Sequence, residues 1–83
     1  MDRAELLKMF LKSASEVAEK DFSGVTEASV IASLGVDSLA LLEVVGELER
    51  SLEISVPDDQ LVGIETVGHV LDLLEKRIAL TKS

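Results

Sequence analysis

Few side chains in this sequence of 83 residues are suited to direct chemistry. Cysteine is absent, which excludes a thiol nucleophile, a thiolate metal site and a disulfide. His69 is the only histidine, so a Ser-His-Asp triad could be written with Ser38, His69 and one of many acids. Nothing in the spacing brings these residues together, and we predict no catalytic residue and no enzyme activity. Asp58 and Asp59 are adjacent but lack the ligand spacing of a calcium loop, so no metal site is predicted.

Ser38 lies in the stretch Leu34-Gly35-Val36-Asp37-Ser38-Leu39, where a glycine ends one segment and an Asp-Ser pair precedes an apolar helical run. Either Asp37 or Ser38 is suited to cap that helix, because a short polar side chain can accept a backbone N–H. The same place suits a phosphate, since the first N–H groups of a helix are unpaired and the helix dipole is positive there. Local sequence therefore leaves two interpretations of Ser38, a helix cap or the site of an attached phosphodiester.

The elements that position Ser38 are predicted to be helices. Apolar side chains recur at helical spacing over about residues 3–20, from residue 37 or 38 to about 51, and over about 67–80. Asp2 with Glu5 resembles a capping box, and Thr66 is suited to cap the last helix. A short helical turn should follow Pro57, which fits the first position of a helix. The pattern predicts an all-α four-helix bundle in a single domain, residues 1–83, with three longer helices, one short helix and a long loop over residues 21–36.

The second helix is predicted to bury one apolar stripe, formed by Leu41, Leu42, Val45, Leu48 and Leu52. Its acids Glu43 and Glu47 share an exposed face with Arg50, and Glu49 lies beside the stripe. Gly46 is unexpected here, because glycine in the middle of a helix costs roughly 1 kcal/mol relative to alanine. We expect either a close approach by another molecule at Gly46 or a neighbouring side chain that needs the space.

Charge is concentrated in one part of the chain. The net charge is −8, and residues 37–65 hold eight acids against the single base Arg50. Such a field repels nucleic acids and anionic lipid and attracts basic partners, although a solvated surface is the simpler interpretation. With Phe10 and Phe22 as the only aromatic residues, no platform for stacking bases is available. The start lacks the apolar core of a signal peptide, so we expect a cytoplasmic monomer with no nucleic-acid partner and no membrane insertion.

The order of motifs over residues 34–74 resembles the acyl carrier proteins. The Leu-Gly-x-Asp-Ser-Leu motif at residues 34–39 is followed by an acidic helix, the turn Val56-Pro57-Asp58, and Thr66-Val67 at the start of the last helix. The resemblance implies that a phosphopantetheinyl transferase moves a 4′-phosphopantetheine arm from coenzyme A to Ser38. The thiol of this arm would hold acyl groups as thioesters, so a protein without cysteine would support thiol chemistry.

The resemblance also implies roles for the neighbours of Ser38. Asp37 and Leu39 would flank the attachment site and contact the transferase and later partners. Glu43, Glu47 and Glu49 would face basic docking patches on acyl-loading and synthase enzymes. An aliphatic space for the acyl chain would be lined by Leu42, Val45, Leu48, Leu52, Val56, Ile64, Val67 and Val70.

Three positions depart from the carriers of fatty acid synthesis. Ala40 and Arg50 stand where many of those carriers have an acid, and Gly46 replaces a residue that is commonly bulky. These differences make a specialised pathway, such as polyketide or lipid-modifying synthesis, an alternative to fatty acid synthesis. A second hypothesis, from another class, is an unmodified acidic interaction module with the same fold.

Overall fold

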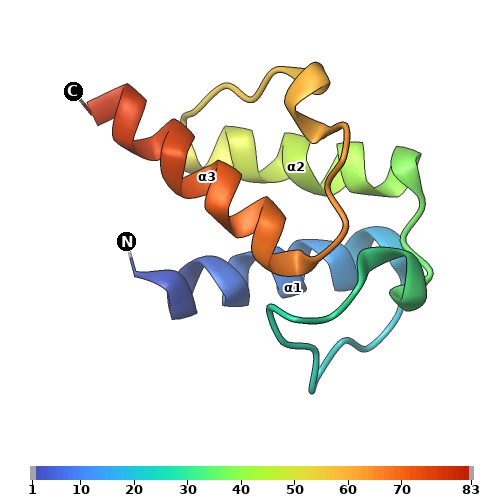
Figure 1. Ribbon diagram of the computed structural model, residues 1–83. Coiled ribbons are helices and arrows are strands. Elements are labelled where there is room, and N and C mark those ends of the chain that lie inside the picture. Colours follow the sequence, from blue (N-terminus) through green and yellow to red (C-terminus); the bar gives the residue numbers. More distant parts are fainter. Residues whose placement is uncertain (1, 83) are drawn as a thin grey trace.

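The computed structural model describes residues 2–82 and consists of helices and loops (Figure 1). The chain forms three α-helices, which are α1 (Arg3–Ala18), α2 (Ser38–Leu52) and α3 (Val67–Lys82). The connections between them contain two 3-10 helices. These are η1 (Ile31–Leu34) and η2 (Asp58–Leu61). The predicted all-α fold is confirmed, and η2 is the expected short helix after Pro57. In the described part of the chain no helix is both long and apolar enough to cross a membrane.

Helix ends follow local capping chemistry. Asp2 caps α1 by accepting the Glu5 N–H at 2.9 Å, as the capping-box pattern predicted. α1 ends two residues earlier than predicted, because Glu19 adopts a left-handed conformation with φ 55° and its N–H bonds to the Ser15 carbonyl. Glu53 ends α2 in the same way, with φ 56°.

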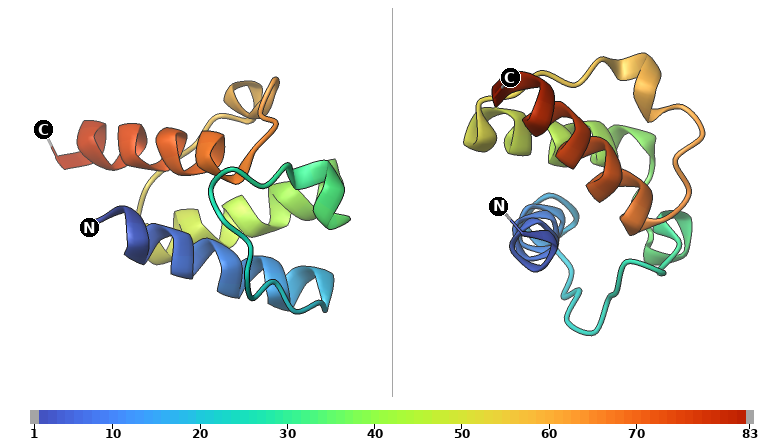
Figure 2. Two further views of the ribbon diagram at one scale, coloured as in Figure 1. Left: turned by 60° about the horizontal axis from the view of Figure 1, so that its bottom comes forward. Right: turned by 60° about the vertical axis from the view of Figure 1, so that its left-hand side comes forward.

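One aliphatic core joins the three helices and their connections. Figure 2 shows α3 lying across the pair formed by α1 and α2, with the first residues of α1 and the last of α3 at the same end. The buried apolar side chains of the helices are Leu6, Phe10, Ala14, Leu41, Val44, Val45, Leu48, Val67, Val70, Leu71 and Leu74. The connections add Phe22, Ile31, Val36, Ile54 and Val56. Full burial of one large aliphatic side chain contributes about 1.5–3 kcal/mol, so this cluster dominates folding.

The stripe predicted for α2 was partly wrong. Leu42 is 40% exposed, whereas Val44, which the prediction left out, is completely buried. α2 is apolar on more than one side in its first half, so helical spacing alone could not select the buried face.

The long loop between α1 and α2 is tied to the start of α3. The N–H groups of Val67 and Gly68 donate to the carbonyls of Ser29 and Glu27 at 3.0 and 2.8 Å. In the opposite direction, the Ile31 N–H donates to the Glu65 carbonyl at 2.9 Å. These bonds satisfy helix N–H groups that have no partner inside α3. The loop and the segment that leads into α3 therefore hold each other in place.

A cluster of charges around Arg3 joins α1, the loop and α3. The Arg3 guanidinium donates to Glu27 at 2.8 Å and to the Gly68 carbonyl at 3.0 Å, and it pairs with Asp72 at 2.8 Å and with Glu75. The hydrogen bond to Glu27 is the main cause that raises the pKa of Arg3 above its usual range. We call this set the Arg3 cluster. It fastens the first turn of α1 to α3.

Candidate functional site

Asp37 and Ser38 form the N-terminal end of α2, and the structure separates their roles. Asp37 is the N-cap, with extended backbone, and its carboxylate accepts the Ala40 N–H at 2.8 Å. Ser38 is the first residue of the helix and is exposed. Its hydroxyl makes no hydrogen bond to any described residue. The cap is thus supplied by Asp37, and the Ser38 hydroxyl is left accessible for chemistry.

The backbone around Ser38 is suited to an attached phosphate. The Leu41 N–H bonds to the Asp37 carbonyl at 2.9 Å, and the Ala40 N–H to the Asp37 side chain. The N–H groups of Ser38 and Leu39 have no partner within the described residues. Two free donors and the positive end of the α2 dipole therefore lie beside the Ser38 oxygen. A phosphodiester on this oxygen fits the site.

Gly35 makes the turn that presents Asp37 and Ser38. It ends η1 in the left-handed region, with φ 80°, and its N–H donates to the Ala32 carbonyl at 3.3 Å. Residues with a side chain rarely adopt this conformation. The ammonium group of Lys20 lies against Gly35, in the place that a Cβ atom would take. The glycine of the motif is therefore explained by backbone geometry, since the Lys20 ammonium is the end of an exposed, flexible side chain that can move aside.

Two grooves meet at Ser38. The first, which we call the Val62 groove, has a volume of about 440 Å³ and is lined by Ser38, Leu41, Leu42, Asp58, Leu61, Val62, Gly63 and Ile64. The second, the Ile31 groove, has a volume of about 390 Å³, and its lining includes Ile31, Val36, Asp37, Ser38, Leu41, Ile64 and Glu65. Ser38, Leu41 and Ile64 belong to both. An arm on Ser38 would thus start where two mostly aliphatic channels join.

The residues predicted to shelter an acyl chain occupy two different places. Leu42 and Ile64 line the Val62 groove at the surface. Leu52 is half-buried, while five others are packed in the closed core: Val45, Leu48, Val56, Val67 and Val70. Leu41, Leu61 and Val62 line the same groove as Leu42 and Ile64 but were not among the residues predicted to shelter the chain. Shelter by the core residues stays a prediction, and it requires the helices to part.

Exposed apolar side chains surround the site. Leu39 follows Ser38 and is 66% exposed, and Val62 across the groove is 81% exposed. Exposed leucine and valine side chains close to an accessible hydroxyl are typical of a surface that binds other proteins. Leu39 was predicted to contact partners, but Val62 was missed because the sequence places it only in a turn.

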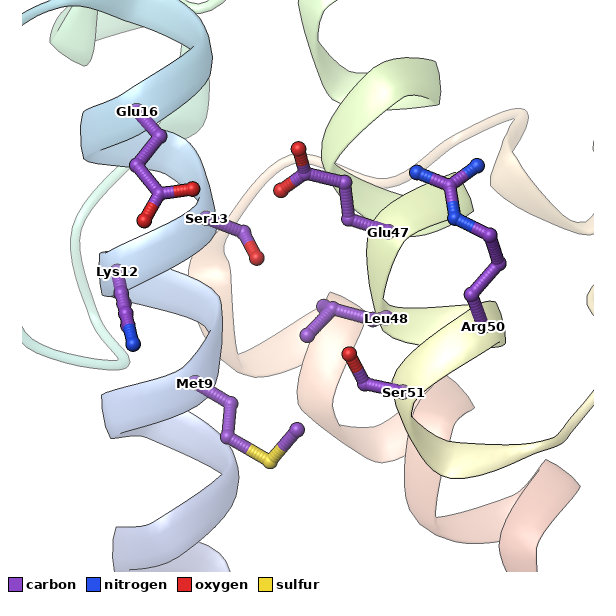
Figure 3. Close-up of a pocket in the computed structure, with 8 residues that line it drawn as sticks. All are labelled: Met9, Lys12, Ser13, Glu16, Glu47, Leu48, Arg50 and Ser51. Carbon is purple, nitrogen blue, oxygen red and sulfur yellow. The ribbon is translucent and has the colours of Figure 1, made fainter.

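The acids predicted to bind partners do not form one flat face. Glu43 is exposed, whereas Glu47 and Glu49 are half-buried. Figure 3 shows the Glu47 carboxylate turned toward α1, where it faces the carboxylate of Glu16 across a groove of about 400 Å³. Arg50 lines the same groove from the α2 side, and its guanidinium lies farther from α1 than the Glu47 carboxylate does (Figure 3). Glu43 and Glu47 also line a shallow hollow with Gly46 and Arg50, so two of the three acids share a surface with one base.

His69 forms its hydrogen bonds at the start of α3 and not with Ser38. Its Nδ1 atom accepts the N–H groups of Glu65 and Thr66 at 3.1 and 3.3 Å, and no described hydrogen bond joins it to Ser38. The structure thus does not bring together the triad that could be written from the sequence. Among residues 2–82 no group of three or more His, Asp or Glu side chains is placed to hold a metal ion.

Comparison with protein families agrees with this site. Residues 5–74 match the family model described as "Phosphopantetheine attachment site". The chain is 40% identical over 74 residues to an acyl carrier protein of Saccharopolyspora erythraea, covering 88% of this chain and 78% of that one. It is 47% identical over 53 residues to an acyl carrier protein of Amoebophilus asiaticus, covering 64% and 66% of the two chains.

Solved structures of acyl carrier proteins also match this chain. A crystal structure of an acyl carrier protein from Thermotoga maritima matches with a TM-score of 0.90 and 27% identity, over 98% of this chain and 95% of that one. The solution structure of the acetyl actinorhodin acyl carrier protein from Streptomyces coelicolor matches with a TM-score of 0.75 and 31% identity, over 98% and 94%. Fold and site thus define a small helical carrier domain. The chain belongs to the acyl carrier protein family, whose members carry a 4′-phosphopantetheine prosthetic group.

Proposed function

We propose that Ser38 is the attachment site and that its Oγ atom carries the 4′-phosphopantetheine arm. The observation that carries this proposal is the division of roles at the start of α2, where Asp37 provides the cap and leaves the Ser38 hydroxyl exposed and unbonded. The family match supports the identity of the group. When bound, the group supplies a thiol that holds acyl chains as thioesters.

Attachment requires one displacement at phosphorus. The Ser38 oxygen forms the new bond to phosphorus, the bond to the nucleotide half of coenzyme A breaks, and the hydroxyl proton passes to a base of the transferase. This chain presents the oxygen, and its free N–H groups at Ser38 and Leu39 face the charge of the product. We propose that the chain is a carrier and that its partner enzymes, in the cytoplasm, supply the catalytic groups.

We propose that partners dock around Ser38 and along α2. Asp37 and the exposed Leu39 would contact the transferase, and Glu43, Glu47 and Glu49 would attract basic patches on loading and synthase enzymes. The net charge of −7 over residues 37–65 supports this, because a concentrated field speeds the encounter with basic partners and is screened by salt.

We infer that the acyl groups belong to fatty-acid, polyketide or other specialised lipid synthesis. Ala40 and Arg50 remove two negative charges from the face of α2 where carriers of fatty acid synthesis often have acids. Two of the similar solved structures come from actinorhodin acyl carrier proteins of Streptomyces coelicolor, at 31% identity. Both observations favour a specialised pathway for this chain.

The test is to incubate the protein with coenzyme A and a broad-specificity phosphopantetheinyl transferase and to measure its intact mass. We expect a gain of one phosphopantetheine group in the wild type and none in Ser38→Ala. Ser33→Ala, at an exposed serine in η1, is the matched control and should gain the group normally. If the wild type gains nothing with several transferases, the alternative of an unmodified acidic interaction module is supported instead.

A further inference from the structure

The first turn of α3 contains a capping arrangement in which histidine takes the place of an acid. Thr66 caps α3, since its hydroxyl accepts the His69 N–H at 3.2 Å. In return, Nδ1 of His69 accepts the N–H groups of Thr66 and Glu65 at 3.3 and 3.1 Å. In a capping box this reciprocal bond is made by Glu or Gln at the third helical position. Here an imidazole ring makes it.

This arrangement fixes the protonation state of His69. Two N–H donors converge on Nδ1, so Nδ1 must present a lone pair and the ring proton must lie on Nε2. A protonated imidazole carries N–H on both nitrogens and accepts nothing. Its positive charge would also lie at the positive end of the α3 dipole. Protonation of His69 therefore removes both hydrogen bonds and adds an unfavourable charge.

The segment that His69 holds forms a wall of the site at Ser38. Ile64 lines both grooves that meet there, and Glu65 lines the Ile31 groove. The Glu65 carbonyl accepts the Ile31 N–H at 2.9 Å, and Thr66 pairs with Val30 in an isolated β-bridge. Figure 1 shows this connection running from η2 to the start of α3. The wall is thus held by η1 on one side and by His69 on the other.

We propose that His69 is a positioning residue for the groove wall beside Ser38 and that it holds the wall only while its imidazole is unprotonated. The geometry of both grooves then depends on the protonation state of this ring. Both hydrogen bonds to Nδ1 are exposed, so water replaces them when they are lost and the wall loosens without unfolding of the domain. A looser wall widens the grooves into which an arm on Ser38 leads.

Other charged groups near this turn do not pair with His69. Glu65 precedes it by four residues and Asp72 follows by three, while Glu27 and Arg3 contact the adjacent Gly68 from the loop and from α1. Every described ion pair in this region is made by Arg3. His69 is therefore the group whose protonation breaks the hydrogen bonds of the wall. Because carboxylates lie nearby, the experiment needs a control variant in which residue 69 does not titrate.

The experiment uses the unmodified protein, so its result does not depend on whether Ser38 accepts an arm. NMR of a ¹⁵N,¹³C-labelled sample from pH 8 downward would follow the imidazole nitrogens, the Ile64 methyl groups, and solvent exchange of the Glu65 and Thr66 amides. The matched variant His69→Gln keeps a side-chain acceptor at the third position but does not titrate. His69→Ala removes the acceptor at every pH.

At pH 8 we expect the ring proton on Nε2 and equally protected amides in the wild type and His69→Gln. Exchange in His69→Ala should be about two- to tenfold faster, the loss expected for one ordinary hydrogen bond. Once the imidazole signals show that the ring is protonated, the wild type should exchange as fast as His69→Ala after correction for intrinsic rates, and its Ile64 signals should shift, while His69→Gln stays protected. A ring proton on Nδ1 at pH 8, or the same pH response in wild type and His69→Gln, would overturn the proposal.

Discussion

Asp37 and Ser38 are adjacent, and their different contacts explain how one short motif serves both folding and chemistry. A cap serine would have its hydroxyl turned toward the N–H groups of the helix, where a transferase could not use it without weakening the helix. With Asp37 as the cap, modification of the Ser38 oxygen would cost α2 little stability. The motif therefore needs both residues, in this order.

This division predicts different effects of two substitutions on stability. Asp37→Ala should lower the free energy of unfolding by about 1 kcal/mol, the usual loss for a helix cap. For a domain of this size that loss lowers Tm by roughly 4–8 °C. Ser38→Ala should change stability by no more than about 0.5 kcal/mol, as for other exposed positions. Thermal unfolding of the unmodified proteins measures both, and equal losses would mean that the hydroxyl contributes to the cap.

The structure removes one of the two roles expected for Gly46. A Cβ atom at this position would meet no atom within 4 Å, so no side chain of this chain needs the space. Gly46→Ala should therefore raise the free energy of unfolding by up to about 1 kcal/mol, measured from the urea midpoint. Gly68→Ala is the control, because its Cβ would lie 3.1 Å from the Glu27 carbonyl oxygen, and it should lower stability.

If Gly46→Ala stabilises the protein as expected, packing within this chain does not explain the glycine, and contact with another molecule stays a prediction. Gly46→Met then tests such a contact, since it should slow loading or turnover with a cognate partner while the fold persists. Unchanged activity of Gly46→Met would leave the glycine without a role in docking.

At the scale of elements, periodicity and capping residues were sufficient to predict the three α-helices and the turn after Pro57. The exact ends depended on backbone conformations such as that of Glu19, which residue type does not determine. η1 was not predicted, because its four residues are too few for a helical period to appear. The site was predicted at Ser38 by the order of motifs, whereas Val62 and His69 became relevant only when the fold brought distant segments together.

The Arg3 cluster makes the attachment of α1 to α3 sensitive to one side chain. Arg3→Met should lower the free energy of unfolding by about 1–2 kcal/mol at low salt, since each of its three partly exposed ion pairs is worth at most about 1 kcal/mol. Lys8→Met, at an exposed cation of α1 with no described ion pair, should change it by less than about 0.5 kcal/mol. Urea unfolding at low and high salt measures both, and 1 M salt should shrink the Arg3 effect.

The pH dependence of this cluster has a definite sign. The pKa of Arg3 is raised in the folded state, chiefly by its hydrogen bond to Glu27, so its contribution is present below the ordinary arginine pKa and is lost only above it. The difference between wild type and Arg3→Met should therefore be the same at pH 7 and pH 10. A difference that disappears by pH 10 would contradict the assignment.

At the scale of the whole molecule, the acidic segment should control the rate of partner encounter. Glu43→Gln combined with Glu47→Gln should lower the kcat/KM of the transferase by roughly two- to tenfold at low salt, because two charges of the docking surface are lost. Raising the salt to 1 M shortens the Debye length to about 3 Å and should remove most of the difference. Glu19→Gln changes an exposed acid outside the segment and should have little effect. An equal loss in Glu19→Gln would mean that only net charge matters.

The Arg3 cluster has a consequence for the order in which the molecule assembles during translation. Arg3 is made early, but its partners Asp72 and Glu75 come about seventy residues later in the chain. At a synthesis rate of about 5–20 residues per second, that delay is roughly 4–14 s. The nascent helix α1 can pair first with Glu27, the earliest partner to be made. The full set of contacts around Arg3 can form only once α3 has been made, so the attachment of α1 to α3 by charge is completed late in synthesis.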